Sequence, residues 1–263
     1  PPPPPPPPPL SSPPSPLSSL PSSPPALLLP TVLLCDYDDT LFPTSAVSSA
    51  GTCRADALKV SAEQQAELEL LAVELRDFLR QATAIGARVA IVTLATQRWV
   101  SQTMSRFLPG VDWDEELQNL NILIIYARES LGKVEHERAS LEEGVDVFMQ
   151  SKRRAISQAL RKFGVRRASP VNLISVGDSR TEAEAARDFM WCKDDVDPQT
   201  SLPSYCKTIK LADQPSVETV RAQVAALLDL LPTIVAHPAD LDMELSEANE
   251  PTSPLHKDTF SQV

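Results

Sequence analysis

Short apolar runs alternate with longer amphipathic segments through the middle of the chain. Runs rich in leucine and β-branched residues predict strands at 31–35, 88–93, 121–126, 171–176 and 206–211. Between and after them, helical periodicity predicts helices at 61–84, 97–107, 150–163, 180–190 and 215–231. The helix at 61–84 opens with Ser-Ala-Glu-Gln, which has the spacing of a capping box, and Gly86 follows its end.

Regular alternation of strands and helices places the chain in the α/β class. We expect a Rossmann-like three-layer sandwich with a mainly parallel sheet of five or more strands, joined by right-handed crossovers. Two intervals are irregular, at 43–60 after the first strand and at 127–147 after the third. Neither is long enough for a separate lid domain.

The two ends of the chain differ in composition from the middle. Residues 1–30 contain 16 of the 26 prolines, open with nine in a row and carry no charge, so polyproline II or disorder is expected there. Residues 237–263 hold six acids against one lysine and are predicted to be a disordered acidic tail. The remaining segment, 31–236, is long enough for one domain with a well-covered core.

The overall charge is negative, with a formal net charge of −11 and a pI near 4.8. A nucleic-acid-binding protein needs a basic face, so we expect no nucleic-acid partner. The basic cluster that begins at Lys152 is expected to be a solvated helix face. No apolar run reaches the length of about 18 residues that indicates a membrane span, so no membrane association is predicted.

The four cysteines, at 35, 53, 192 and 206, show no CxxC pair and no metal-ligand spacing with the histidines. This usage suits a reducing compartment, and segment 26–35 lacks the basic flank of a signal peptide, so a cytoplasmic location is expected. The proline tract has the composition that SH3, WW or profilin-like partners bind. The alternative is low-complexity sequence without a partner.

The first charged residue, Asp36, directly follows the uncharged strand at 31–35, and Asp38 comes two positions later. In a parallel sheet, ligands bind at the carboxyl ends of the strands. If the backbone bends after Asp36, the two carboxylates can act on one atom from two directions. The alternative is a strand followed by an acidic turn or helix cap, which is common.

Further polar residues stand at strand ends or on the helices that follow. They are Thr93, Lys152, the pair Gly177-Asp178, and Glu182 four positions after Asp178. A carboxylate that attacks phosphorus needs positive counter-charge, which a divalent cation and a lysine supply. A threonine hydroxyl adds hydrogen bonds to the phosphate. Each residue alone has an ordinary explanation, but the ordered set favours phosphoryl chemistry.

In these motifs the chain resembles the haloacid dehalogenase-like (HAD) superfamily. Asp36-Tyr-Asp38-Asp-Thr40 is similar to its first motif, Thr93 to the second, Lys152 to the third, and Gly177-Asp178 with Glu182 to the fourth. The resemblance implies a phosphatase that hydrolyses phosphate monoesters with Mg2+. By resemblance, Asp36 is the nucleophile and a metal ligand. Asp38 is the acid/base and binds Mg2+ through its backbone carbonyl. Thr93 and Lys152 bind phosphate, and Asp178 binds the metal. Glu182 contacts the metal through a water or contacts one of the metal's ligands.

Two positions depart from the family pattern, and one assignment stays open. Asp39 stands where many members have glycine, and an extra acid there is expected to perturb metal or phosphate affinity. Glu182 replaces an aspartate, and its longer side chain leaves its contact undefined. Lys133 is the rival of Lys152 for the third motif.

Three other functions use similar features. Receiver domains of two-component signalling also phosphorylate an aspartate, but theirs follows the third strand, which here ends Ile124-Ile-Tyr126 without an acid. A phosphotransferase or mutase of the same superfamily would use the same intermediate. A non-catalytic, proline-rich interaction protein with this fold is the non-enzymatic alternative.

Substrate access depends on the cap that members of the superfamily insert after the first motif or the third strand. Only 43–60 and 127–147 leave room for one, so a minimal cap or none is predicted. Such an open site suits a bulky phosphorylated substrate, either a phosphoprotein or a large metabolite. Segment 43–60 is the candidate for substrate contact, and a surface loop is the alternative.

Overall fold

The fold is a parallel α/β sandwich, as the alternation predicts. The computed structural model describes residues 29–48, 55, 58–130, 147–166, 169–192 and 203–245. Its sheet has six strands in the order β3-β2-β1-β4-β5-β6, and every neighbouring pair is parallel. The strands are β1 (Thr31–Cys35), β2 (Arg88–Thr93), β3 (Leu123–Tyr126), β4 (Asn172–Gly177), β5 (Tyr205–Lys210) and β6 (Leu241–Glu244). The Rossmann-like α/β fold class is confirmed.

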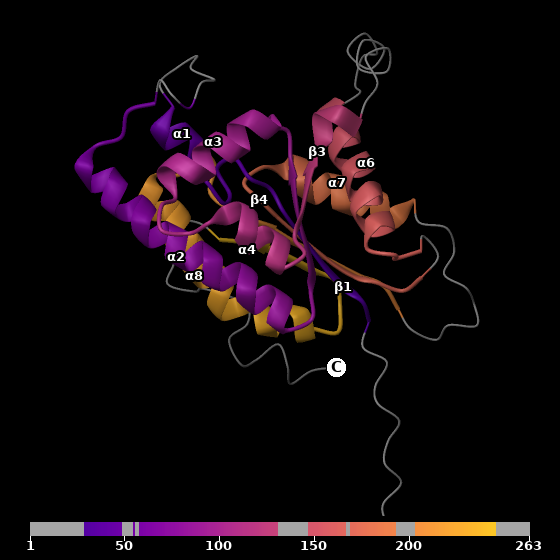
Figure 1. Cartoon of the computed structure of the whole chain (residues 1–263). Coiled ribbons are helices and arrows are strands. Elements are labelled where there is room, and N and C mark those ends of the chain that lie inside the picture. Colours follow the sequence, from indigo (N-terminus) through magenta and orange to yellow (C-terminus); the bar gives the residue numbers. More distant parts are fainter. Residues whose placement is uncertain are drawn as a thin grey trace, which may run out of the picture.

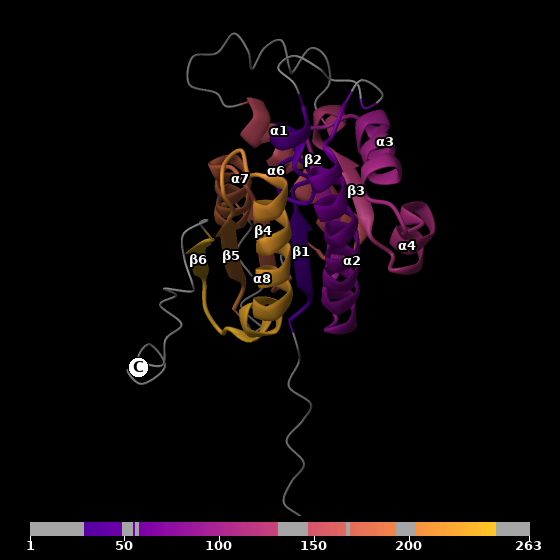
Figure 2. The same ribbon diagram turned by 90° about the vertical axis from the view of Figure 1, so that its left-hand side faces the viewer.

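Helices cover both faces of the sheet (Figures 1 and 2). On one face, α2 (Ala62–Ala84) packs against α8 (Val217–Ala236), and α3 (Gln97–Phe107) and α4 (Trp113–Asn119) contribute to the same core. On the other face, α6 (Val147–Lys162) packs against α7 (Arg180–Trp191). Two short elements follow β1 and β3, the helix α1 (Thr44–Val47) and the 3-10 helix η2 (Ala127–Ser130).

The central strand β1 is buried along its whole length, and its side chains alternate between the two cores. Leu33 and Cys35 join the core under α2 and α8, whereas Val32 and Leu34 join the core under α6 and α7. Continuing this alternation, the next side chain, that of Asp36, turns toward the face of α6 and α7. The strand thus delivers its terminal carboxylate to the face that carries Lys152.

Several elements differ from the predicted pattern. The capping box of Ser61 and Gln64 begins α2 as expected, but α8 continues through Pro232 to Ala236, beyond the predicted end at 231. Burial of Leu231 and Ile234 on either side of Pro232 outweighs the lost backbone hydrogen bond. The short helices α1 and α4 were not predicted, because four and seven residues show too little periodicity.

The predicted end of the domain at residue 236 requires correction, since β6 lies inside the supposedly disordered segment 237–263. Leu241 and Met243 pack against the core, while Asp242 and Glu244 alternate with them. A prediction based on composition missed this short edge strand, because its acidic residues are typical of a disordered tail. In the structure these acids are paired, Asp242 with Arg187 of α7 at 2.6 Å and Glu244 with Lys210 of β5 at 4.0 Å.

Helix α8 is long and apolar enough, by length and composition alone, to cross a membrane. The fold gives this apolar character another explanation. One stripe of α8 is buried in the core beneath α2, through Val217, Val220, Val224, Leu227, Leu231 and Ile234.

A buried lysine closes the carboxyl end of α8. Lys207 of β5 is fully buried, and its Nζ donates hydrogen bonds to the carbonyls of Ile234 at 2.6 Å and Val235 at 3.2 Å. Asn172 donates a further bond to Val235. These donors satisfy carbonyls that have no partner within the helix. Burial nevertheless lowers the pKa of Lys207 to about 8, against a smaller opposing effect of Asp240.

This lowered pKa predicts a characteristic pH dependence of stability. Between about pH 8 and pH 10 the unfolded chain keeps the Lys207 proton that the folded chain has lost, so stability rises with pH. The free energy of unfolding of the wild type, relative to Lys207→Met, should therefore increase over this window in urea titrations. A difference that stays flat or falls would show that the folded protein keeps the proton.

A matched pair of substitutions tests the packing of α2. Leu75 is fully buried, whereas Leu70 on the same helix is 49% exposed. Leu75→Ala should lower the free energy of unfolding by about 2–5 kcal/mol, because it opens a cavity in the core. Leu70→Ala removes the same atoms from the surface and should cost less than about 1 kcal/mol. Equal losses in urea denaturation would contradict the described face of α2.

Candidate active site

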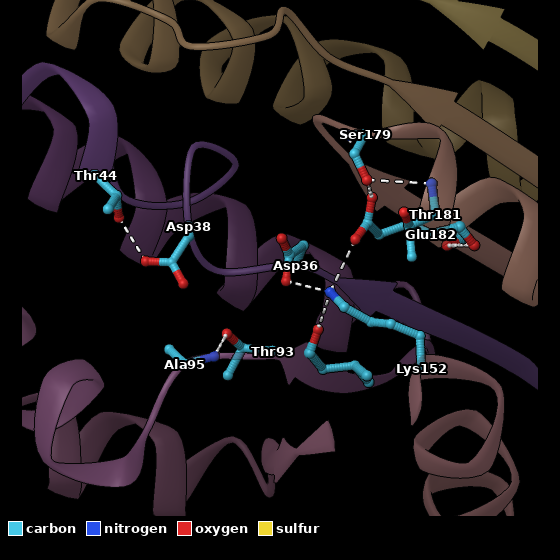
Figure 3. A network of polar contacts seen from close by, with 11 residues as sticks. Asp36, Asp38, Thr44, Thr93, Ala95, Lys152, Ser179, Thr181 and Glu182 are labelled. Carbon is cyan, nitrogen blue, oxygen red and sulfur yellow. Dashed lines mark hydrogen bonds and ion pairs between the residues drawn. The ribbon is translucent and has the colours of Figure 1, made fainter. Parts of the chain in front are cut away.

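Asp36 stands where the central strand ends. Its backbone N–H still donates to the Val176 carbonyl of β4 at 2.9 Å, so the sheet holds its main chain. Its carboxylate is buried, and Oδ1 lies 2.5 Å from the Nζ of Lys152. Figure 3 shows this carboxylate between Asp38 and Thr93 on one side and Lys152 and Glu182 on the other.

Lys152 reaches this point from α6 and is itself buried. Its ammonium has three acceptors, Oδ1 of Asp36, Oε1 of Glu182 at 2.9 Å and the Val92 carbonyl of β2 at 2.8 Å (Figure 3). Burial alone would lower the pKa of Lys152, but the two carboxylates outweigh it and raise the pKa above its usual value. The ammonium therefore stays charged. The basic cluster was predicted as a solvated face, but Lys152 is buried, whereas Arg153 and Arg154 are exposed.

Glu182 uses its two oxygens for two different tasks. While Oε1 binds Lys152, Oε2 accepts from the backbone N–H of Ser179 at 3.2 Å and from its hydroxyl at 2.5 Å. The bond from the Ser179 backbone N–H is one half of the capping box that begins α7, and in the other half the Ser179 side chain accepts from the backbone N–H of Glu182. Lys152 chiefly lowers the pKa of Glu182 against the effect of burial, so this carboxylate is ionised.

The longer arm of Glu182 is accommodated by a glycine. A Cβ atom built on Gly177 would lie 2.4 Å from Cγ of Glu182, a distance at which atoms overlap. The side chain thus lies directly over the Gly177 backbone and extends to Lys152. This contact answers the question left open by the exchange of aspartate for glutamate, because the chain fills the space that glycine leaves.

Asp38 lies on the opposite side of Asp36 from Lys152, after the backbone has bent (Figure 3). Its Oδ1 accepts hydrogen bonds from the Thr44 hydroxyl at 2.5 Å and from Nε1 of Trp99 on α3 at 2.9 Å. An isolated bridge to Phe42 closes the intervening loop. The bend thus separates the two acids, with the Asp38 carboxylate turned toward Thr44 (Figure 3).

Asp39 adopts the left-handed backbone conformation, with φ of 55°. Glycine is the residue best suited to this region, and aspartate is among the few others that tolerate it. Its carboxylate accepts from the backbone N–H of Ser45 at 2.7 Å and from its hydroxyl at 2.5 Å. The extra acid is thus turned into the first turn of α1, although its charge still contributes to the raised pKa of Asp178.

Thr93 is the last residue of β2 and is fully buried. Its hydroxyl oxygen accepts a hydrogen bond from the backbone N–H of Ala95 at 2.9 Å, which closes a tight turn after the strand (Figure 3). Because this contact occupies the oxygen as an acceptor, the hydroxyl hydrogen remains for a ligand beside Asp36.

Negative charge accumulates around Asp178, the residue that follows β4. Burial raises its pKa to about 7, and the charges of Asp36, Glu182 and Asp39 add to this effect. Burial likewise raises the pKa of Asp36 to about 7 even with Lys152 bound to it. Lys152 is committed to Asp36 and Glu182, so the carboxylate of Asp178 has no matching cation of its own among the residues described.

A divalent cation fits this charge distribution. Magnesium binds oxygen ligands and commonly uses only one or two carboxylates, with water and substrate phosphate completing its shell. Asp36 and Asp178 offer two such carboxylates, and the charge of Asp36 contributes to the raised pKa of Asp178. Within the described part of the chain, no group of three or more acidic, histidine or cysteine side chains is gathered as a ready metal site.

The structure thus brings Asp36, Lys152 and Glu182 into direct contact, with Asp38 and Thr93 facing them. Sequence reasoning missed the contacts of Trp99 and Thr44 with Asp38, and nothing in the spacing indicated them. It also missed Ser179, although Ser179 and Glu182 have the spacing of a capping box, which was a usable signal. The rival Lys133 lies outside the described residues.

An open pocket lies beside this cluster and not within it. It has a volume of about 840 Å³ between α3, α4 and β3, and Tyr126 is among its lining residues. Tyr126 is the register partner of Thr93, so the pocket begins one strand away from the site. Its lining does not include Asp36, Asp38, Asp178, Glu182 or Lys152.

Neither the known protein families nor the curated proteins include a match to this chain. The protein is therefore characterised by its structure. It has a Rossmann-like fold with a six-stranded parallel sheet, and a buried lysine binds two carboxylates at the edge where the strands end.

Removing the buried ammonium tests the cluster. Lys152→Met should lower the free energy of unfolding by about 3–5 kcal/mol at pH 7, because it leaves two buried carboxylates without a cation. Glu182→Gln should cost clearly less in the Lys152→Met background than in the wild type, which a double-mutant cycle in urea measures.

The neighbouring residue provides the matched control. Arg153 pairs with Asp188, but these side chains are 44% and 35% exposed, so Arg153→Met should change stability by less than about 1 kcal/mol. Additive effects of Lys152→Met and Glu182→Gln would contradict the contact between their side chains.

Proposed function

We propose that this protein is a Mg2+-dependent phosphatase of the HAD-like type, which hydrolyses phosphate monoesters through an aspartyl-phosphate on Asp36. The observation that carries the proposal is the contact between Lys152 and Asp36. A buried ammonium from α6 binds a carboxylate at the carboxyl end of the central strand, and Thr93 and Asp38 lie on the side of that carboxylate away from Lys152. This arrangement supports phosphoryl transfer to a carboxylate, because it supplies counter-charge at Oδ1 of Asp36 and leaves Oδ2 without a hydrogen-bond partner among the described residues.

The first half of the reaction uses the second oxygen of Asp36. Lys152 binds Oδ1, so we assign attack on phosphorus to Oδ2. The new bond joins Oδ2 to phosphorus while the bond from phosphorus to the leaving oxygen breaks. Lys152 offsets the negative charge, and the Thr93 hydroxyl donates to a phosphate oxygen. Covalent catalysis of this kind divides one difficult displacement into two easier ones.

Asp38 moves the proton in both halves. Its protonated carboxyl donates to the leaving oxygen, which departs as the alcohol. In the second half, the Asp38 carboxylate takes a proton from water while the water oxygen attacks phosphorus. Inorganic phosphate is released, and both carboxyl groups regain their starting states. A second acid at this distance favours turnover over storage of the phosphoryl group.

The metal would be held by the carboxylates of Asp36 and Asp178 and by the main-chain carbonyl of Asp38. When bound, Mg2+ neutralises part of the phosphate charge and orients the phosphoryl group. The raised pKa of Asp178 supports this assignment, because burial and the neighbouring carboxylates leave an unbalanced negative charge there.

Substrate access depends on the segments that follow β1 and β3. Their described residues include α1 and η2, whereas residues 49–54, 56–57 and 131–146 of the intervals 43–60 and 127–147 lie outside the described residues. We propose an open site that takes a phosphoprotein or a large phosphorylated metabolite.

The decisive test is Asp36→Asn, assayed for phosphate release from 4-nitrophenyl phosphate with Mg2+. Loss of the nucleophile should lower kcat by about 1,000-fold or more while the protein stays folded in a urea titration. Acid-quenched wild type, incubated with radiolabelled substrate, should carry phosphate that hydroxylamine releases, and the variant should not.

Asp39→Asn is the matched control, since it makes the same change three positions later on a carboxylate bound to Ser45. It should keep most of the parent rate. Undiminished hydrolysis by Asp36→Asn would refute the assignment. Transfer of the phosphoryl group to an added acceptor, without free phosphate, would instead favour the phosphotransferase.

A further inference from the structure

A tryptophan is bonded to the acid/base candidate. Trp99 lies in the first turn of α3, and its Nε1–H donates to Oδ1 of Asp38 at 2.9 Å across 61 residues of sequence. The Thr44 hydroxyl donates to the same oxygen at 2.5 Å from the other side of the loop. No hydrogen bond to Oδ2 of Asp38 is found among the described residues.

The two donors make the carboxyl oxygens of Asp38 unequal. The indole N–H can only donate, so Oδ1 must accept from it. With the Thr44 hydroxyl as a second donor, both lone pairs of Oδ1 are occupied. A proton on Asp38 therefore belongs on Oδ2, the oxygen that remains for the reacting group.

We propose that Trp99 is a positioning residue for Asp38, which fixes the carboxyl rotation so that Oδ2 delivers the proton to the leaving oxygen. This inference rests on the proposed phosphatase function. Trp99 touches neither substrate nor metal in this scheme and acts only through Asp38. The bond also ties α3 to the loop after β1, so that the acid cannot turn away during turnover.

The packing around Trp99 supports a fixed orientation. Its ring meets that of Phe42 edge-on, with centroids 6.5 Å apart and planes at 79°. Phe42 in turn stacks on the buried Tyr37, whose hydroxyl is hydrogen-bonded to Thr103 on α3 at 2.6 Å. Edge-to-face and stacked pairs of this kind hold rings in defined orientations. Trp99 is thus anchored to the same loop that carries Asp38.

Dependence on the leaving group separates positioning from general support of the fold. A strongly basic leaving oxygen needs the proton from Asp38, whereas 4-nitrophenolate departs readily without it. A defect confined to proton delivery must therefore grow with the basicity of the leaving group. A defect in folding or phosphate binding lowers the rates for all esters by the same factor.

The experiment compares Trp99→Phe with wild type on 4-nitrophenyl phosphate and phenyl phosphate, with Mg2+ present. Phenylalanine keeps the aromatic packing and removes only the indole donor. The quantity to compare is kcat/KM, which reports only the first half of the reaction, in which the leaving group departs. For Trp99→Phe, kcat/KM on phenyl phosphate should fall about tenfold, with less than about threefold change on 4-nitrophenyl phosphate. Thr44→Val, which removes the second donor, should shift the ratio in the same direction.

Trp113→Phe is the matched control, because Nε1 of Trp113 donates to the Leu108 carbonyl at 2.8 Å, away from Asp38. It should leave the ratio of the two rates unchanged. Equal losses by Trp99→Phe on both esters, or no loss on phenyl phosphate, would overturn the positioning role.

A measurement without substrate tests the contact itself. The indole N–H resonance that disappears in Trp99→Phe should shift when Asp38 is changed to alanine, and that of Trp113 should not. An unmoved Trp99 resonance overturns the inference while leaving the phosphatase proposal intact. If Asp36→Asn keeps the parent rate although the resonance shifts, the proposed function is what fails, and the proton-delivery role falls with it.

Discussion

One buried charge, the ammonium of Lys152, constrains the whole carboxyl edge of the sheet. An ammonium without water is costly unless anionic partners and a carbonyl surround it at hydrogen-bond distance. Here the partners come from β1, β2 and α7, so three segments must meet at one point for the charge to be tolerated. The same condition holds the site in place, because displacing any partner exposes the others to the full desolvation cost. The central strand and the capping box of α7 are arranged around this requirement.

Much of the fold was predictable, because it depends on patterns that are local in sequence. Apolar runs predicted the strands β1 to β5, and the Ser61 capping box predicted the start of α2. The failures occurred where tertiary burial overrides a local rule. Pro232 should end a helix, but flanking core residues carry α8 past it, and β6 is held at the sheet edge despite an acidic composition. Such outcomes depend on neighbours that a single sequence does not specify.

The candidate site divides in the same way. Asp36, Thr93 and the Gly177-Asp178 pair were predictable because strand ends are visible in the sequence and parallel strands share one edge. The bond from Trp99 to Asp38 was not, since it depends on the rotation of α3 about its own axis and on how sharply the chain bends after Asp36. Asp39 illustrates the same limit. Its residue type indicated an extra charge near the proposed metal site, whereas its left-handed backbone turns that charge toward Ser45.

The close approach of Glu182 to Gly177 has a consequence for how this sequence can change over time. A methyl group at position 177 collides with the glutamate arm, so alanine there is excluded as long as position 182 carries glutamate. Shortening the acid to aspartate first would not relieve this collision, because aspartate keeps the Cβ and Cγ atoms, which lie 2.9 Å and 2.4 Å from the added carbon. The shorter side chain would also withdraw the carboxylate from Lys152. Each substitution is thus harmful, and neither prepares the way for the other.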